Sequence, residues 1–128
     1  TYNIYSMLDT MRFDGSLYVG TEVGNEFVQD TLSQIYLEME RLREEPVGQE
    51  ELDMVRNYLL GNFLTMLDGP FNVSEVVRTL YAEGLPVRFF DELVRTVQTI
   101  DAEELQRLAQ VYLREEEMWE VVVGQGDE

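Results

Sequence analysis

Carboxylates are the most abundant reactive side chains in this chain of 128 residues, which has 26 acidic residues, 9 basic residues, no cysteine and no histidine. Without thiols or imidazoles, the chain has no cysteine nucleophile, no Ser-His dyad and no Cys or His ligand for a metal. Two acidic runs have the oxygen ligands that hard cations prefer, Glu115-Glu116-Glu117 and Glu50-Glu51 with Asp53. Consecutive carboxylates point in different directions on a helix and lack the spacing of a calcium loop. We therefore interpret both runs as solvated faces.

The nine glycines do not form a phosphate-binding loop between a strand and a helix, which disfavours nucleotide binding. Most of them fit turns and helix ends. Gly61 differs because it lies inside a helical pattern, where glycine costs about 1 kcal/mol relative to alanine. We expect it to allow the close approach of a neighbouring helix or sheet.

The formal net charge of −17 disfavours binding to nucleic acid and to anionic lipid surfaces. The apolar content of 45% is too high for a disordered acidic tail. Apolar stretches fall far short of the roughly 20 residues that span a bilayer, so no membrane span is expected. Partners should be neutral or basic molecules, or another protein. Because cysteine-free domains occur in the cytoplasm and in the periplasm, both compartments remain open.

All nine basic residues are arginine, and carboxylates outnumber them in both halves of the chain. Adaptation to high salt explains this excess, because the Debye length falls to about 3 Å at 1 M salt and self-repulsion is suppressed. GC-rich coding bias is the alternative explanation. If the chain is salt-adapted, its melting temperature should rise between low and molar NaCl, as differential scanning calorimetry can measure. A flat or falling curve would contradict salt adaptation.

The first 23 residues predict a β-hairpin. The pattern alternates over 2–6, β-forming residues fill 16–23, and a turn signal, Arg12-Phe13-Asp14-Gly15, lies between them. Apolar spacings of three and four then predict helices over 25–45 and 52–66. Three shorter helices should follow. Their signals are Asn72 with Glu75 as a capping box, Gly84 after a helix end, Pro86 at a first helical position and Asp101 with Glu104 as a second capping box.

A β-branched run over 118–123 predicts a buried C-terminal strand that returns to the hairpin. The fold class expected is α+β, with an antiparallel sheet (hairpin plus C-terminal strand) covered by a layer of about five helices. The chain starts at Thr1 without an initiator methionine or a signal peptide, so we interpret residues 1–128 as a single partial domain. Three strands make a small sheet for such a layer, and further strands should come from an N-terminal part of the domain or from a second chain.

Several segments, taken in order, give a specific resemblance that covers nearly the whole chain. They are residues 1–9 (TYNIYSMLD), 40–45 (ERLREE), 50–52 (EEL), 57–64 (NYLLGNFL), 83–86 (EGLP), 100–109 (IDAEELQRLA) and 121–124 (VVVG). Together they resemble the insulinase and pitrilysin family of zinc peptidases. More narrowly, they are similar to the latter part of the non-catalytic C-terminal domain in the bacterial branch related to mitochondrial processing peptidase.

The resemblance implies a role in binding peptides. Paired repeats of that family form a clamshell chamber around an unfolded peptide, and the catalytic repeat carries an H-x-x-E-H zinc motif. This chain has no histidine, so zinc is expected in the catalytic domain of the same polypeptide or of a partner subunit, and no cofactor is expected in this chain. The expected function is the non-catalytic, substrate-binding portion of a zinc metalloendopeptidase.

The resemblance also implies one substrate-binding residue, Tyr2. The family pattern has a tyrosine at this position and an arginine several residues before it, and the pair contacts the peptide backbone near the scissile bond. That arginine would precede Thr1. A tyrosine hydroxyl there could stabilise the charge that develops on the scissile carbonyl oxygen, a role worth about 3 kcal/mol. The alternative for Tyr2 is a packing role.

Two alternatives to a peptidase portion remain. One is a catalytically dead paralogue that acts as a structural or assembly subunit, as some family members do. The other is an acidic α+β protein-interaction module, which would expose an apolar patch. An intact H-x-x-E-H motif in the same polypeptide or in a co-encoded partner distinguishes the first from an active peptidase.

Overall fold

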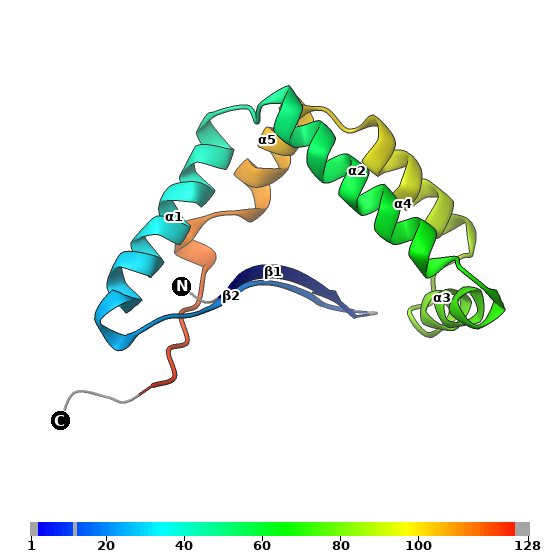
Figure 1. Cartoon of the computed structure of the whole chain (residues 1–128), viewed down its shortest axis with the longest axis horizontal. Helices are drawn as coiled ribbons and strands as arrows, with labels where there is room; N and C mark the ends of the chain where they lie inside the picture. The colour runs from blue at the N-terminus through cyan, green and yellow to red at the C-terminus, as the bar shows by residue number, and fades with distance from the viewer. Residues whose placement is uncertain (1–2, 12, 125–128) are drawn as a thin grey trace.

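A β-hairpin followed by five α-helices forms the chain in the computed structural model, which describes residues 3–11 and 13–124 (Figure 1). The predicted α+β class and the predicted number of helices are confirmed. The elements in order are β1 (Asn3–Thr10), β2 (Gly15–Glu22), the 3₁₀ turn η1 (Asn25–Phe27), α1 (Val28–Glu44), α2 (Gln49–Met66), α3 (Pro70–Ala82), α4 (Arg88–Thr99), α5 (Ala102–Tyr112) and the 3₁₀ turn η2 (Glu115–Glu117).

The hairpin pairs β1 with β2 in antiparallel register, from Asn3 opposite Glu22 to Thr10 opposite Gly15. The predicted Asp14-Gly15 signal lies at the turn, where the Asp14 carboxylate accepts a hydrogen bond of 2.8 Å from the Gly15 amide. Gly20 lies under the ring of Tyr5, and a Cβ atom at this position would come within 2.5 Å of the ring. A larger residue at position 20 would therefore need the half-exposed Tyr5 ring to move aside.

The helix ends follow the predicted signals at most positions. Gly69 and Gly84 adopt φ values of 87° and 72°, the left-handed region that favours glycine, at the start and end of α3. Asp101 caps α5, because its carboxylate accepts a 2.9 Å hydrogen bond from the Glu104 amide. Pro86 lies two residues before α4 and not at its first position.

The capping box predicted at Asn72 and Glu75 is wrong. Helix α3 begins at Pro70, so Asn72 lies inside its first turn. Its amide instead donates to the carbonyl of Asp68 at 2.8 Å, and Glu75 pairs with Arg78. Proline is favoured at a first helical position because it lacks the N–H that would remain unbonded there. The helix therefore starts three residues earlier than the polar signal indicates, with Gly69 instead of Asn72 as its N-cap.

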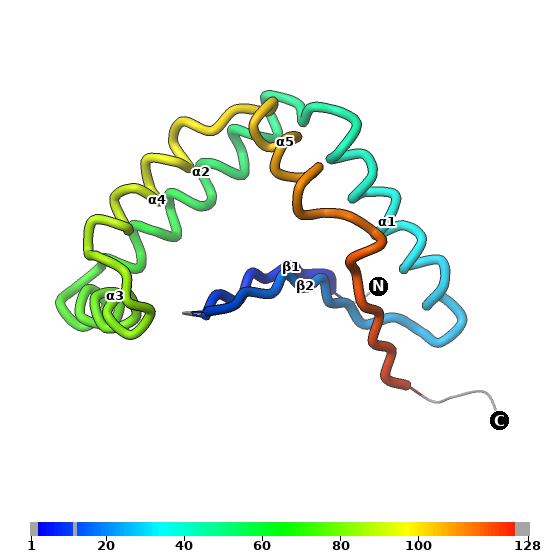
Figure 2. The backbone as a smooth tube through the Cα atoms, turned by 180° about the vertical axis from the view of Figure 1, so that it is seen from behind, coloured from blue at the N-terminus to red at the C-terminus, as the bar shows by residue number. Residues whose placement is uncertain are grey.

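The helices pack in two pairs, α1 with α5 and α2 with α4, which form the two arms of an arch (Figures 1 and 2). Helix α3 lies at the far end of the α2–α4 arm, and the hairpin lies under the arch. Within the α2–α4 arm the rings of Phe63 and Phe90 meet edge to face, with centroids 5.7 Å apart. Among the described residues each helix contributes one buried apolar side chain, and these are Met39, Leu52, Leu80, Phe90 and Ala109.

In each pair one arginine joins the two helices by donating hydrogen bonds to carbonyl groups at a helix end. Arg56 of α2 donates to the carbonyl of Val97 at 3.0 Å and to that of Ile100, at the end of α4. Arg43 of α1 donates to the carbonyl of Leu113 just after α5. These guanidinium groups satisfy carbonyls that have no partner within their own helix and place positive charge at the negative end of the helix dipole.

The predicted C-terminal strand is not formed. Residues 118–123 have no strand pairing, and the sheet of the described residues has two strands only. Met118 is extended, with φ −87° and ψ 142°, while Trp119 and Val123 are 96% and 94% exposed. The β-branched sequence favours an extended backbone, but a strand also needs a partner edge to bond with.

The surface of the chain is large for its mass. Its accessible area is 10656 Å², whereas a compact monomer of 14.9 kDa exposes about 7,000 Å². Large apolar side chains such as Phe71, Tyr81 and Leu64 are 87%, 86% and 74% exposed. The arch therefore presents apolar surface that a compact domain of this size would bury.

Gly61 has no close neighbour, so the close approach predicted there is wrong. A Cβ atom at residue 61 would meet no heavy atom within 4 Å. We expect Gly61→Ala to stabilise the chain by about 0.5–1 kcal/mol, because alanine in α2 lowers the entropy of the unfolded state. Urea unfolding followed by circular dichroism measures this change. Gly69→Ala is the control and should destabilise, because Gly69 has a φ of 87° that alanine adopts only with strain. A loss of stability in Gly61→Ala would contradict the expectation.

Candidate polypeptide-binding groove

Tyr2, the substrate-binding residue that the sequence indicates, lies outside the described residues. The described part of the site begins with β1, directly after it. Glu50 and Glu51, in the first turn of α2, and Glu115–Glu117, which form η2, are exposed. Asp53 is partly exposed and accepts a hydrogen bond of 2.7 Å from Arg56. Within residues 3–11 and 13–124, acidic side chains form no group of three or more that could hold a metal ion.

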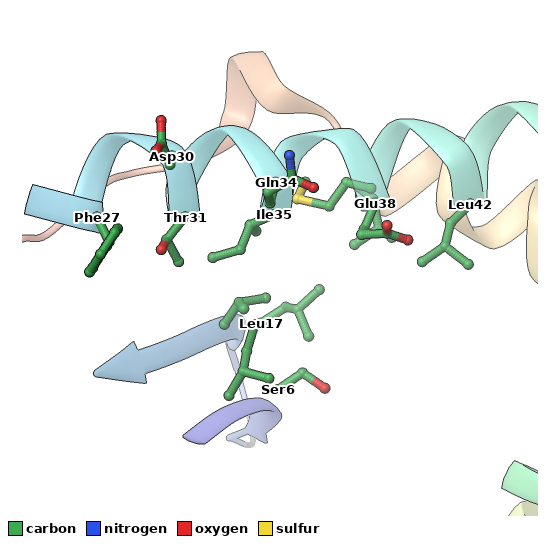
Figure 3. A pocket seen from close by; sticks show the side chains of 13 residues that line it. Ser6, Leu17, Phe27, Asp30, Thr31, Gln34, Ile35, Glu38 and Leu42 are labelled. Carbon is green, nitrogen blue, oxygen red and sulfur yellow. The ribbon is translucent and has the colours of Figure 1, made fainter. Parts of the chain in front are cut away.

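An open apolar groove lies between the hairpin and α1 (Figure 3). Its volume is about 880 Å³. The side chains of Leu17 and Ser6 point from the hairpin toward α1, and those of Ile35 and Leu42 point from α1 toward the hairpin. Thirteen residues line it: Ile4, Ser6, Leu17, Val19, Phe27, Asp30, Thr31, Gln34, Ile35, Glu38, Met39, Leu42 and Leu113.

The periodicities of the two elements produce these facing walls. Side chains alternate along a strand, so Ile4, Leu17 and Val19 share one face of the hairpin. On α1, Ile35, Met39 and Leu42 recur at spacings of four and three and share one face. The apolar face of the hairpin and that of α1 therefore face each other across the groove without packing together.

The groove is open to solvent rather than enclosed. Ile4 and Phe27 are each 54% exposed, and Val19 is 42% exposed, although all three line it. The hairpin and α1 are not among the pairs of described elements that pack extensively. An enclosed pocket for a small molecule would bury most of its ligand's surface, which this geometry does not allow.

Polar groups along α1 make one border of the groove acidic. Asp30, Gln34 and Glu38 follow one another at spacings of four beside the apolar stripe. Glu38 pairs with Arg41 at 2.9 Å, and both side chains are more than half exposed. An exposed pair of this kind contributes little stability. The acidic border agrees in sign with the net charge of the whole chain, which is −17.

The opposite face of the hairpin carries Tyr18 and Asp9, together with the exposed Tyr5 and Met7. The Tyr18 hydroxyl donates to the Asp9 carboxylate at 2.9 Å. This hydrogen bond raises the pKa of Tyr18, with smaller contributions from desolvation and from the charge of Asp9. The face toward α1 is the one that carries Ile4, Leu17 and Val19.

A hydrogen bond from α1 holds the segment that follows α5. The Tyr36 hydroxyl donates to the Glu120 carboxylate at 2.8 Å. This bond raises the pKa of Tyr36 above its ordinary value of 10.0, followed in size by desolvation and by the charges of Glu120 and Glu115. The contact fixes the extended C-terminal segment beside the helix that forms one wall of the groove.

The pH dependence of this contact follows from the raised pKa. The neutral hydroxyl donates the bond, so its stabilising effect is fully present below about pH 10 and is lost as pH rises through the higher pKa of the folded state. We expect the fluorescence anisotropy of Trp119, the single tryptophan of the chain and the neighbour of Glu120, to fall in that range as the segment is released. Tyr36→Phe should show the lower anisotropy at every pH. A wild-type pH profile that matches the variant would contradict the role of the bond.

The groove offers binding chemistry. It presents aliphatic and aromatic surface, the hydroxyls of Ser6 and Thr31, and the carboxylates of Asp30 and Glu38. Cysteine and histidine, the usual activated nucleophile and general base, do not occur in the sequence. Such a surface suits a polypeptide, which supplies apolar side chains and backbone polar groups together.

The spacing that predicts the helix over 25–45 includes Phe27, Ile35 and Leu42. Such an apolar stripe normally faces a packed core, whereas Phe27 and Leu42 are exposed. The alternation in the hairpin indicates which face is apolar, but it contains no information about the distance to α1. The separation between the two walls is a tertiary property.

None of the helices that the structure describes combines the length and the apolar character required to cross a bilayer. Comparison of the chain with protein-family models, with curated proteins and with solved structures found no match. The function proposed below therefore rests on the sequence, the fold and the groove of this chain.

Proposed function

We propose that this chain is the non-catalytic, substrate-binding portion of a zinc-dependent metalloendopeptidase that cleaves peptides in a clamshell chamber. The observation that carries the proposal is the order of elements, a hairpin that begins directly after Tyr2 and is followed by five helices. The resemblance of the sequence segments to the insulinase and pitrilysin family is the other support for the proposal. The apolar surface of the arch supplies walls on which a polypeptide can lie.

The residues of this chain do not fit the zinc site of that family. The H-x-x-E-H motif needs two imidazoles, and the chain has no histidine. No catalytic step is therefore assigned to this chain. In the proposed enzyme the zinc belongs to the catalytic domain of the same polypeptide or of a partner subunit, and this chain binds and orients the peptide.

The proposed contribution of this chain to catalysis is a hydrogen bond from Tyr2. A phenol hydroxyl is a neutral donor below about pH 10, so it can bind a peptide carbonyl across the physiological range. If it is aimed at the scissile carbonyl oxygen, the bond strengthens as negative charge develops there. The arginine that accompanies the tyrosine in the family would lie before Thr1.

The test is the cleavage of a quenched fluorescent peptide library by the full polypeptide that contains this chain, with and without a zinc chelator. Cleavage that the chelator abolishes and added zinc restores is the expected result. The co-encoded neighbour is added in a second arm, since the catalytic domain belongs to either polypeptide. Absence of chelator-sensitive cleavage in both arms would contradict the proposal.

The second candidate is a structural or assembly role, either as a catalytically dead subunit or as an acidic interaction module. The excess of exposed apolar surface favours it, because such surface marks interaction sites. Under this alternative the polypeptide and its neighbour lack an H-x-x-E-H motif and do not cleave the library. A stable complex would then be the functional form.

A further inference from the structure

We infer that the groove between the hairpin and α1 is half of a permanent interface, and that its other half is a neutral-to-basic polypeptide segment that pairs with a free edge of the hairpin as a β-strand. This inference concerns a lasting partner and not the peptide that is cleaved. It therefore goes beyond the proposed function and does not depend on it.

The first step is the amount and kind of surface that needs to be covered. The chain exposes 10656 Å², against about 7,000 Å² for a compact monomer of its mass. Permanent interfaces bury about 2,000–5,000 Å² in total and resemble a domain core cut in half. The groove has this composition, because its apolar lining is mainly aliphatic: Ile4, Leu17, Val19, Ile35, Leu42 and Leu113.

The second step is the unpaired edges of the hairpin. The sheet of the described residues has two strands, so the outer edge of each strand has backbone N–H and C=O groups without a strand partner. An isolated two-stranded hairpin is marginally stable in water, and its edges are templates for another strand. Neither β1 (Asn3–Thr10) nor β2 (Gly15–Glu22) contains the lysine or proline that commonly protects an edge.

A strand added at an edge would also fill the groove. Its side chains alternate, so every second one would lie on the apolar face of the hairpin beside Leu17 or Val19 and point toward α1. Ile35 and Leu42 would then pack against those side chains from the other wall. One strand thus satisfies the backbone groups of the edge and covers apolar surface of both walls.

The third step is the charge of the partner, which disfavours a second copy. Two copies would bring together two chains with a net charge of −17 each. Asp30 and Glu38 lie on the groove itself, so a second copy would bring like charges into its border. A basic segment would instead gain attraction and faster association, most strongly at low ionic strength.

The probes are three synthetic ten-residue peptides added to the chain in 0.1 M NaCl. The first alternates valine or isoleucine with arginine. The second replaces the arginines by glutamate. The third keeps the charge of the first but has two central valines replaced by proline, which prevents strand pairing. Isothermal titration calorimetry measures affinity, hydrogen exchange locates the protected amides, and analytical ultracentrifugation at 0.1 and 2 M NaCl measures the oligomeric state.

The first peptide should bind at least tenfold more tightly than each of the other two and should slow amide exchange in the hairpin. Leu17→Asn in the groove should weaken its binding at least tenfold, and Leu64→Asn on α2 should not. Both leucines are exposed in the chain alone, at 39% and 74%, so each variant should still fold. Circular dichroism verifies this.

Four outcomes would overturn the inference. Equal affinity for the arginine and glutamate peptides would remove the charge argument. Equal affinity for the proline peptide would show attraction without strand pairing. Binding that Leu17→Asn does not weaken would place the peptide outside the groove. A dimer that forms without peptide and protects the same amides would identify a second copy as the occupant.

Discussion

Replacing Tyr2 by phenylalanine in the full enzyme is expected to lower kcat/KM for peptide cleavage by about 10²-fold. This substitution keeps the ring and removes the hydroxyl, so it removes only the proposed hydrogen bond to the scissile carbonyl. One such donor is worth about 3 kcal/mol in the transition state, and each 1.36 kcal/mol corresponds to a factor of ten in rate. Initial rates with one fluorogenic peptide measure the change.

The control for this prediction is Tyr5→Phe. Tyr5 lies three residues later in β1, and its ring covers Gly20 on the face of the hairpin that points away from α1. It should therefore retain kcat/KM. If Tyr2→Phe folds normally and cleaves at the wild-type rate, Tyr2 has a packing role only. That result would leave the chelator-sensitive cleavage itself untouched, so the two hypotheses are separable.

Replacing Arg56 by methionine is expected to lower the free energy of unfolding by about 2–3 kcal/mol. The side chain is 19% exposed and donates to two carbonyls at the end of α4 and to the carboxylate of Asp53 at 2.7 Å. Methionine keeps much of the apolar volume but leaves those carbonyls without this partner, and hydrogen bonds from charged groups contribute about 1.5–3 kcal/mol. The melting temperature should fall by about 10 °C, as calorimetry can measure.

The matched control is Arg78→Met on α3. Arg78 also pairs with an acidic residue three positions before it, but its side chain is 68% exposed and its partner Glu75 is 63% exposed. Exposed pairs contribute little because water and salt screen them. We expect a much smaller change than in Arg56→Met, and equal changes in the two variants would contradict the structural role of Arg56.

The local elements could be predicted because their signals are local. The Asp14-Gly15 turn, the three-and-four spacing from Phe27 to Leu42 and the Asp101 cap each depend on residues close in sequence, and the structure has all three. The β-branched residues over 118–123 wrongly predict a strand. Strand formation depends on a partner edge, which is a distant part of the chain or a different chain.

The groove could be predicted in part. Periodicity identifies the apolar face of the hairpin and the apolar stripe of α1, but these patterns normally indicate a core. Whether Val19 packs against Ile35 or faces it across open space depends on the angle between the hairpin and the arch. Arg56 was missed for a similar reason, since its carbonyl partners lie 41 and 44 residues away in sequence.

The two helix pairs are nested along the chain, and this order has a consequence for folding kinetics. Helices α2, α3 and α4 form one continuous segment, whereas α1 and α5 lie on either side of it and meet only across that segment. Closing a long flexible loop costs entropy, and this cost falls when the intervening residues are already compact. The inner α2–α4 arm should therefore form first and bring the ends of α1 and α5 together. The outer arm, which carries one wall of the groove, then depends on the inner arm for its rate of formation as well as for its position.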